Sequence, residues 1–279
     1  IPPSIPYIMY CNASGASISE LFLAGFLPGV LIALCLMVYS YIYCKIHGED
    51  KDKLNAKCME LRAKGLGTVL KEGFWALMSP VIILGGIYGG ICSPTEAATI
   101  SIFYSLIVSL FIYRTIKIRD LPKIMLEGIH SYAPILIILS AAVAFARVIT
   151  LMNVATIVSE AVLSAISSKV VILLLINVLL LFVGMIMDTG PAILVFTPVL
   201  LPVVKALGVD PIHFGIIMCV NLAIGFVTPP MGANLFVASN LSKVSVIDIA
   251  KKAVPFILAF LVALLMITFI PEISLFLVK

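Results

Sequence analysis

Long apolar segments alternate with short polar ones along almost the whole chain. A helix needs about 20 predominantly apolar residues to cross the hydrocarbon core of a bilayer. Because every backbone polar group in lipid must be paired within the protein, this pattern predicts an all-α polytopic membrane protein. The candidate spans are residues 21–44, 74–91, 97–113, 131–152, 170–187, 192–204, 214–239 and 254–278.

The composition agrees with a membrane location. Hydrophobic residues make up 62% of the chain and charged residues 11%, whereas soluble domains average about 45–50% and about 25%. This composition excludes a disordered chain, a nucleic-acid-binding domain and an ordinary cytosolic enzyme. The six cysteines include no CxxC pair, so we expect neither a disulfide framework nor a zinc site.

The distribution of Lys and Arg predicts which loops face the cytoplasm. Residues 45–71 contain seven of the eighteen basic residues, residues 114–123 contain four, and residues 241–252 contain three. Residues 11–20 contain none and are expected outside. The segment 214–239 then runs from outside to inside.

With these loops assigned, residues 169–206 must begin and end outside. The segment has two apolar arms joined at Asp188-Thr189-Gly190-Pro191. The pattern predicts a re-entrant helical hairpin. Its tip is expected near the midplane, because the second arm, residues 192–204, is too short to cross alone.

Two Pro-Pro motifs begin similar stretches with opposite predicted sidedness. Pro28 follows Pro2 by 26 residues, and Pro255 follows Pro229 by the same interval. Similar units of opposite orientation are typical of secondary transporters. We therefore divide the chain into the end of a first repeat (1–44), a cytoplasmic loop (45–72), connecting and scaffold spans (73–168), the hairpin (169–206), and a second broken helix with the last span (207–279).

The second Pro-Pro motif predicts a binding site. Two consecutive prolines interrupt a helix, and irregular backbone at membrane depth is tolerated where it is buried in protein or lines a cavity. Sodium prefers oxygen ligands, which Thr228, Asn234 and nearby carbonyls supply. The alternative is a kink satisfied by neighbouring helices. The candidate ion or substrate residues are Thr228, Pro229, Pro230, Gly232 and Asn234, with Pro3 and Ser4 as their counterparts in the first repeat.

Asp188 is the strongest single candidate. An acidic side chain at membrane depth is costly unless it is paired or hydrated, and such residues usually serve function. We expect Asp188 to bind sodium, with Thr189 and Gly190 in the same turn. The alternative, compatible with the first, is that Asp188 caps the helix that includes Pro191.

Other polar residues lie within or next to the apolar spans. Arg147 either binds an anionic carboxylate or extends to the membrane interface. Asn177 and Asn221 are expected to form hydrogen bonds between helices. Glu96 follows Ser93 by three residues and is expected to complete a capping box.

Three motifs resemble those of a known family. They are GGIYGGICSPTEAA (85–98), MDTGPAILVFTPVLLPVVKALGVDPIHFGI (187–216) and NLAIGFVTPPMGANLFVAS (221–239). Together they resemble the large membrane subunit of tripartite ATP-independent periplasmic (TRAP) transporters of the dicarboxylate and sialic acid type. The opening IPPSIPYIMY resembles the mid-chain Pro-Pro motif of that subunit. The family's N-terminal half is absent, so we expect the chain to be the C-terminal part of a longer protein.

The resemblance implies a multi-pass permease of the bacterial inner membrane that takes up an organic acid such as sialic acid or a C4-dicarboxylate. It implies an elevator mechanism driven by a sodium gradient, with sodium as the coupling ion and no other cofactor. The implied partners are a periplasmic substrate-binding protein and a small four-span membrane subunit, separate or fused, with no nucleic acid. Two alternatives are a stand-alone ion-coupled carboxylate permease and a polytopic membrane enzyme. Asp188 stands alone among the long spans, which argues against the enzyme.

Overall fold

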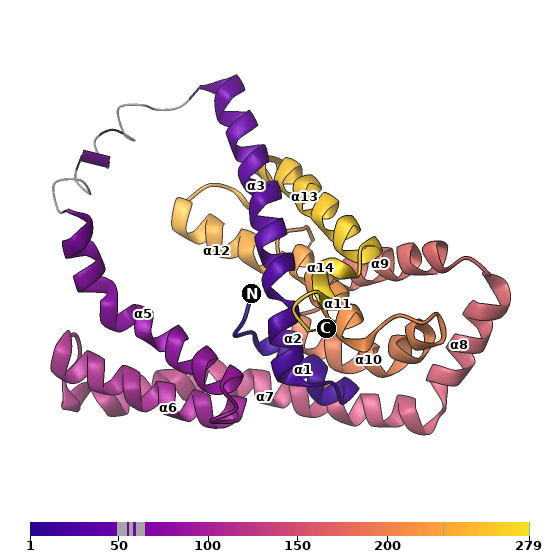
Figure 1. Ribbon diagram of the computed structural model, residues 1–279, viewed down its shortest axis with the longest axis horizontal. Coiled ribbons are helices and arrows are strands. Elements are labelled where there is room, and N and C mark those ends of the chain that lie inside the picture. The colour runs from indigo at the N-terminus through magenta and orange to yellow at the C-terminus, as the bar shows by residue number, and fades with distance from the viewer. Residues whose placement is uncertain (49–54, 56–57, 60–64, 231, 279) are drawn as a thin grey trace. The chain divides into compact units, whose positions relative to one another are not determined.

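The computed structural model describes residues 1–279 except 49–54, 56–57, 60–64, 231 and 279 (Figure 1). All regular structure among the described residues is helical, which confirms the predicted all-α class. A large part of the predicted cytoplasmic loop, residues 45–72, lies outside the described residues.

The helices follow the apolar segments of the sequence. A π-helical turn, η1 (Val108–Ile112), follows α6, and a 3-10 turn, η2 (Ile118–Asp120), precedes α7. The α-helices are α1 (Ile5–Ser14), α2 (Ile18–Ala24), α3 (Phe26–His47), α5 (Leu66–Tyr88), α6 (Pro94–Ile107), α7 (Leu121–Leu151), α8 (Val154–Ala165), α9 (Lys169–Ile186), α10 (Thr189–Ala206), α11 (Pro211–Gly225), α12 (Ala233–Ser242), α13 (Val246–Phe269) and α14 (Glu272–Leu275).

Seven helical segments within the described residues are long and apolar enough to cross a membrane. They are Ile18–His47, Gly67–Tyr88, Pro94–Ile112, Ile118–Leu151, Lys169–Ile186, Thr189–Ala206 and Val246–Phe269. The protein is therefore a multi-pass membrane protein. The predicted span 214–239 is divided into two shorter helices, α11 and α12, by the Pro-Pro segment.

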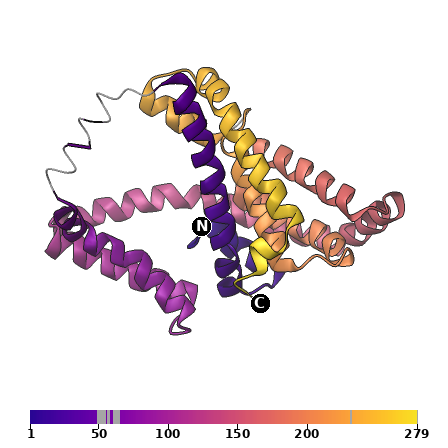
Figure 2. The same cartoon turned by 45° about the horizontal axis from the view of Figure 1, so that its top comes forward.

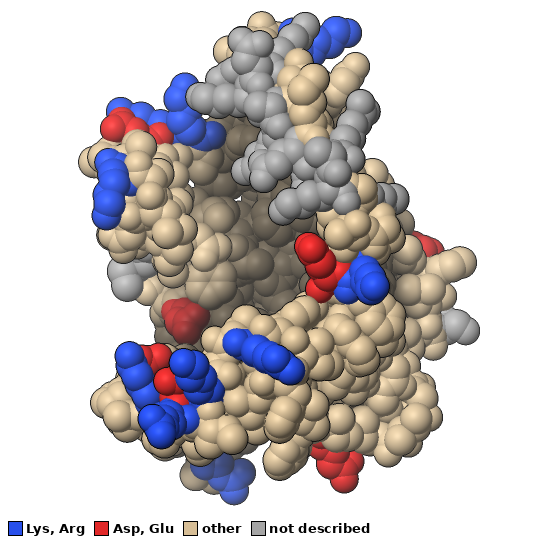
Figure 3. Space-filling model, turned by 90° about the vertical axis from the view of Figure 1, so that its left-hand side faces the viewer, with Lys and Arg blue, Asp and Glu red and all other residues tan. Residues whose placement is uncertain are grey.

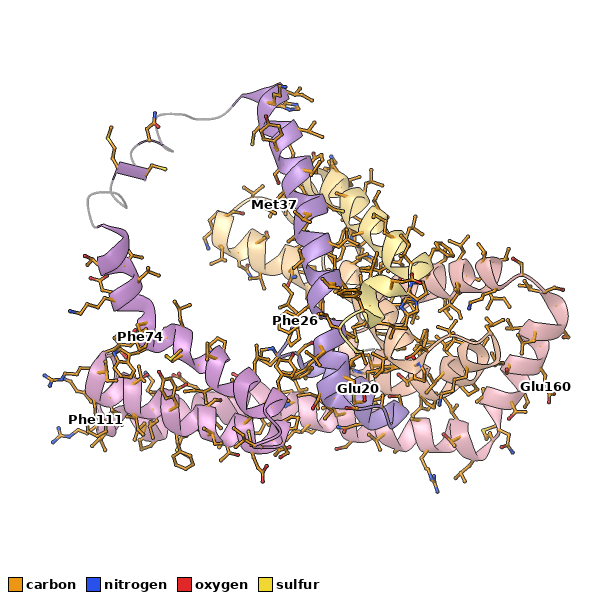
Figure 4. All side chains as sticks on the ribbon, in the orientation of Figure 1. Glu20, Phe26, Met37, Phe74, Phe111 and Glu160 are labelled. Carbon is orange, nitrogen blue, oxygen red and sulfur yellow. The ribbon has the colours of Figure 1, made fainter. Side chains whose placement is uncertain are left out.

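The chain divides into two compact units, and each is described by itself. The smaller unit, residues 41–133, contains α5 and α6, which pack against each other. The Tyr104 hydroxyl donates to the Trp75 carbonyl at 2.7 Å, and the Tyr113 hydroxyl donates to the Glu72 carbonyl at 2.5 Å. Figure 4 marks Phe74 on α5 of this unit.

The larger unit comprises residues 1–40 and 134–279. Its main helix contacts are α9 with α11, α1 with α10, and α8 with α10, and α13 also packs on α11 (Figures 1 and 2). Almost every side chain of α11 is buried, so α11 forms the core of this unit. The two arms of the predicted hairpin, α9 and α10, contact each other less than they contact other helices.

Much of the apolar surface of the chain is exposed. Met37 on α3, marked in Figure 4, is 58% exposed, and most of the face in Figure 3 carries uncharged residues. A soluble monomer rarely exposes such large apolar areas. This surface agrees with a protein that is covered by lipid or by further protein.

The second hairpin arm is longer than its apolar run predicted. The expected segment 192–204 is part of α10, an 18-residue helix that starts at Thr189. The prediction that this arm is too short to span was wrong. The predicted arm was too short because Thr189, Gly190 and Pro191, which form the first turn of α10, add little hydrophobicity. Arm length therefore no longer supports a tip at the midplane, and the re-entrant hairpin stays a prediction.

One further boundary and one further helix differ from the prediction. The expected span 254–278 ends at Phe269, because Pro271 follows and a separate short helix, α14, begins at Glu272. Helix α8, which carries Glu160 (Figure 4), was not predicted. Its 12 residues follow a turn at Asn153 with φ of 54°, and they are too few to register as a span.

Candidate functional site

The start of α10 is built by Asp188. Its Oδ1 accepts a hydrogen bond from the Thr189 backbone N–H at 2.7 Å, and the residue is the N-cap of the helix. The predicted capping role is therefore confirmed. Thr189 and Gly190 are buried, whereas Asp188 is exposed, so its carboxylate retains free acceptor positions after capping.

The second Pro-Pro segment breaks the helix as predicted. Helix α11 ends at Gly225 and α12 begins at Ala233. The Thr228 backbone N–H donates to the Gly225 carbonyl at 3.1 Å, and the Asn234 N–H donates to the Phe226 carbonyl at 3.1 Å. In the described part of the break, these two bonds connect Thr228 and Asn234 to the end of α11.

Two residues of this turn have features that suit a cation site. The Thr228 hydroxyl donates to the Ile224 carbonyl at 2.8 Å, which leaves the lone pairs of Oγ1 available to coordinate a cation. Gly232 has φ of 29°, and a Cβ atom there would lie 2.8 Å from Leu235 Cδ1 and 3.1 Å from the Thr228 carbonyl oxygen. Glycine is therefore required for the tight approach of the chain at this point.

A cavity of about 470 Å³ joins the start of α10 to the break, and we call it the tip cavity. It brings Asp188 and Gly232 together, as the sequence predicted. Thr228, Pro229, Pro230 and Asn234 belong to the same break but are not among its lining residues. The lining residues are Gly184, Ile186, Met187, Asp188, Phe226, Gly232, Ala233 and Phe236.

A second cavity, of about 260 Å³, joins the first Pro-Pro segment to α10, and we call it the repeat cavity. Here Ser4 and Thr189 line one space, while Pro3 is exposed and does not line it. Phe226 lines both cavities. The other lining residues are largely apolar: Ile1, Pro6, Tyr7, Pro28, Gly29, Ile32, Cys219, Val220, Ala223 and Phe260.

Helix α1, which follows the first Pro-Pro motif, packs directly on the second repeat. A Cβ atom on Gly190 would lie 3.1 Å from Met9 Cε, so the start of α10 contacts α1. The Tyr10 hydroxyl donates to the Pro211 carbonyl at 2.7 Å. These contacts place α1 against the starts of α10 and α11, which belong to the second predicted repeat.

The charge at the tip cavity favours a cation. Asp188 is the one acidic residue that lines either cavity, and no Lys or Arg lines them, within the residues that the structure describes. A lone carboxylate beside the backbone of a broken helix can bind a small cation through oxygen ligands.

Arg147 lies apart from this site. It is exposed on α7 and lines neither cavity. Its predicted contact with a substrate carboxylate therefore has no support in the geometry, and both of its interpretations stay predictions.

The predicted hydrogen bonds between apolar helices are confirmed. Asn221 Nδ2 donates to Asn177 Oδ1 at 2.6 Å, and Asn177 Nδ2 donates to Thr268 Oγ1 at 3.1 Å. These bonds connect α11, α9 and α13. The capping box is also confirmed, because the Ser93 N–H donates to Glu96 Oε2 at 2.7 Å and the Glu96 N–H donates to Ser93 Oγ at 3.3 Å.

One feature of the site was not predicted from the sequence. Gly184 on α9 and Gly225 on α11 are in backbone contact. Small residues are enriched where membrane helices contact each other. The chain contains 18 glycines, however, and nothing in the sequence distinguishes these two.

Comparison with known proteins agrees with the family resemblance. The family model described as the tripartite ATP-independent periplasmic transporter, DctM component, matches residues 1–273. The isethionate TRAP transporter permease protein DctMQ of Oleidesulfovibrio alaskensis is 44% identical over 279 residues. The C4-dicarboxylate TRAP transporter large permease protein DctM of Pseudomonas aeruginosa is 38% identical, and the sialic acid TRAP transporter large permease protein SiaM of Vibrio cholerae is 33% identical.

Each alignment covers 99% of this chain. The chain spans 43% of the length of the Oleidesulfovibrio relative, 63% of the Pseudomonas relative and 64% of the Vibrio relative. The matched family is a transporter permease component and not an enzyme family, which excludes the membrane-enzyme alternative. The chain belongs to the DctM family, the large membrane subunit of TRAP transporters.

Proposed function

We propose that this chain forms the sodium- and substrate-binding part of a TRAP permease that takes up an organic acid. The observation that carries the proposal is the tip cavity, where the exposed carboxylate of Asp188 lies beside Gly232 of the broken helix. The names of the three relatives refer to isethionate, C4-dicarboxylate and sialic acid. All three compounds are anionic at neutral pH, so we propose a substrate of this class.

Sodium binds, in this proposal, between Asp188 and the break. Asp188 supplies a carboxylate oxygen, and Thr228 and Asn234 supply further oxygens once the turn brings them to the tip cavity. The bound cation then offsets the negative charge of Asp188, which otherwise repels an anionic substrate. Sodium binding therefore precedes or accompanies substrate binding.

The organic acid binds alongside, at the repeat cavity. Ser4 and Thr189 supply hydroxyl groups there, while the other walls are largely apolar. The start of α10 also favours an anion through its helix dipole. Pro3, Pro229 and Pro230 keep the two segments non-helical, so that backbone groups are available to both ligands.

The wider system follows from the same proposal. The permease resides in the bacterial inner membrane and moves its ligands in an elevator motion driven by the sodium gradient. A periplasmic binding protein delivers the substrate, and a small four-span subunit, separate or fused, completes the complex. The support for these partners is membership of a tripartite transporter family.

Uptake by the full-length parent in proteoliposomes tests the proposal. An inward sodium gradient is imposed, with and without the cognate binding protein, and labelled isethionate, a C4-dicarboxylate and sialic acid are supplied in turn. We expect uptake of one acid that requires both sodium and the binding protein. Uptake that needs sodium alone would instead identify a stand-alone permease.

The role of Asp188 is tested by Asp188→Asn. Asparagine caps helices about as well as aspartate, so this change removes the charge and keeps the cap. We expect at least about a tenfold rise in the sodium concentration for half-maximal uptake, because one carboxylate ligand is lost. Asp210→Asn is the matched control, since Asp210 caps α11 through the Ile212 N–H at 2.8 Å and lines neither cavity. An unchanged sodium dependence in Asp188→Asn would confine Asp188 to capping.

A further inference from the structure

Helices α9 and α11 touch through their backbones near the tip cavity. A Cβ atom on Gly225 would lie 2.6 Å from Gly184 Cα and still closer to the Gly184 carbonyl carbon and oxygen. A Cβ atom on Gly184 would lie 3.1 Å from Leu222 Cα and 3.2 Å from the Leu222 carbonyl oxygen. All these neighbours are backbone atoms, so no side-chain rotation relieves the overlap.

This contact lies where both helices end. Gly184 is in the last turn of α9 and itself lines the tip cavity, four residues before Asp188. Gly225 is the last residue of α11. Its carbonyl accepts a hydrogen bond from the Thr228 N–H, at the beginning of the break. The contact therefore joins the turn that leads to Asp188 to the turn that leads to Gly232.

The same pair of helices is held together further from the tip. Asn177 and Asn221 are hydrogen-bonded at 2.6 Å, about two turns before Gly184 and about one turn before Gly225. With the helices fixed there, any added volume at the glycine contact displaces their free ends. Those ends carry the two sides of the tip cavity.

We propose that Gly184 and Gly225 are positioning residues, whose backbone contact sets the separation between Asp188 and Gly232 across the tip cavity and thereby the affinity for the coupling cation. This inference rests on the proposed function. The two positions are not equivalent. An alanine at 225 overlaps the backbone of α9, whereas an alanine at 184 needs a shift of only a few tenths of an ångström.

The test uses the full-length parent in proteoliposomes with three variants, Gly225→Ala, Gly184→Ala and Gly128→Ala. The last is the control, because a Cβ atom on Gly128 in α7 would meet no atom of the described residues within 4 Å. The sodium concentration for half-maximal uptake, the maximal rate and the melting temperature are measured for each. We expect the half-maximal sodium concentration to rise about tenfold or more in Gly225→Ala and about twofold to threefold in Gly184→Ala. The control is expected to match the wild type.

The readouts separate positioning from general destabilisation. A lower melting temperature with an unchanged sodium requirement in Gly184→Ala and Gly225→Ala would overturn the inference. If Gly225→Ala does not insert in the membrane, the inference is judged on Gly184→Ala alone. The same comparison of sodium requirement with melting temperature applies. If uptake by the wild type does not depend on sodium, the proposed function fails and this inference fails with it. The wild-type measurement alone shows this outcome, before any variant is compared.

Discussion

The buried amide pair on α9 and α11 allows a quantitative prediction. Asn221 Nδ2 donates both to Asn177 Oδ1 at 2.6 Å and to the Ile217 carbonyl at 2.8 Å. Asn177 Nδ2 donates onward to Thr268 Oγ1, whose hydroxyl donates to the Leu264 carbonyl at 2.8 Å. The change Asn221→Ala removes the donor to Asn177 and leaves that oxygen buried.

The expected cost follows from which groups lose a partner. The Ile217 carbonyl lies within α11 and keeps its place in the helix. The loss of the bond from Asn221 Nδ2 to this carbonyl therefore costs little free energy. Asn177 Oδ1 is left without its hydrogen-bond donor in a residue that is 3% exposed. An unsatisfied buried acceptor costs about 1–3 kcal/mol, while hydrogen bonds between membrane helices average about 0.6 kcal/mol and reach about 1.7 kcal/mol. We expect Asn221→Ala to lower the free energy of unfolding by about 1–2 kcal/mol.

A double-mutant cycle isolates the pair. The variants Asn177→Ala, Asn221→Ala and the double variant of the full-length parent are unfolded by denaturant in mixed micelles, and the free energies of unfolding are compared. We expect a coupling energy of about 1 kcal/mol. Asn240→Ala is the control, since Asn240 is exposed on α12 and its loss should change stability by less than about 0.5 kcal/mol. A coupling energy near zero would refute the reasoning, because the two single losses would then come from packing alone.

Two other predictions concern topology and the packing of α1. A cysteine at Ser17 is expected to react with a membrane-impermeant thiol reagent only from the periplasm, and a cysteine at Ser242 only from the cytoplasm; labelling of both from one side contradicts the inverted repeat. Tyr10→Phe removes the 2.7 Å hydrogen bond to the Pro211 carbonyl and is expected to lower the free energy of unfolding by about 1 kcal/mol. Tyr41→Phe, at a residue that is 70% exposed, is expected to have no effect, and equal losses in both variants would contradict the role of the hydrogen bond.

Local features of the site were predictable from the sequence. The interruption at Thr228-Pro229-Pro230 follows from the missing backbone donors of proline. The cap by Asp188 follows from the preference of helix starts for short acceptor side chains. The bond between Asn177 and Asn221 follows from the cost of leaving amides unpaired in an apolar interior. The break and the cap depend on residues within one or two helical turns. The bond between the amides depends on the need of a buried amide for a hydrogen-bond partner.

Features that join distant segments were not predictable in the same way. Arg147 was a candidate ligand by its chemistry, yet its position on α7 leaves it exposed and away from both cavities. The length of α10 was underestimated, because hydrophobicity marks the apolar part of a helix, and the first turn, Thr189-Gly190-Pro191, adds little to it. Hydrophobicity thus located the helices better than it located their ends.

The sequence by itself determined that this is an all-helical membrane protein, where its helix breaks at prolines, and which family it resembles. Only the tertiary structure decided that Thr189 shares a cavity with Ser4, that Asp188 shares another with Gly232, and that α9 meets α11 through two glycines. The physical reason is that helix formation and helix ends depend on nearby residues. The pairing of helices depends on which surfaces fit, and glycine shows its part in that fit only once the opposing backbone is in place.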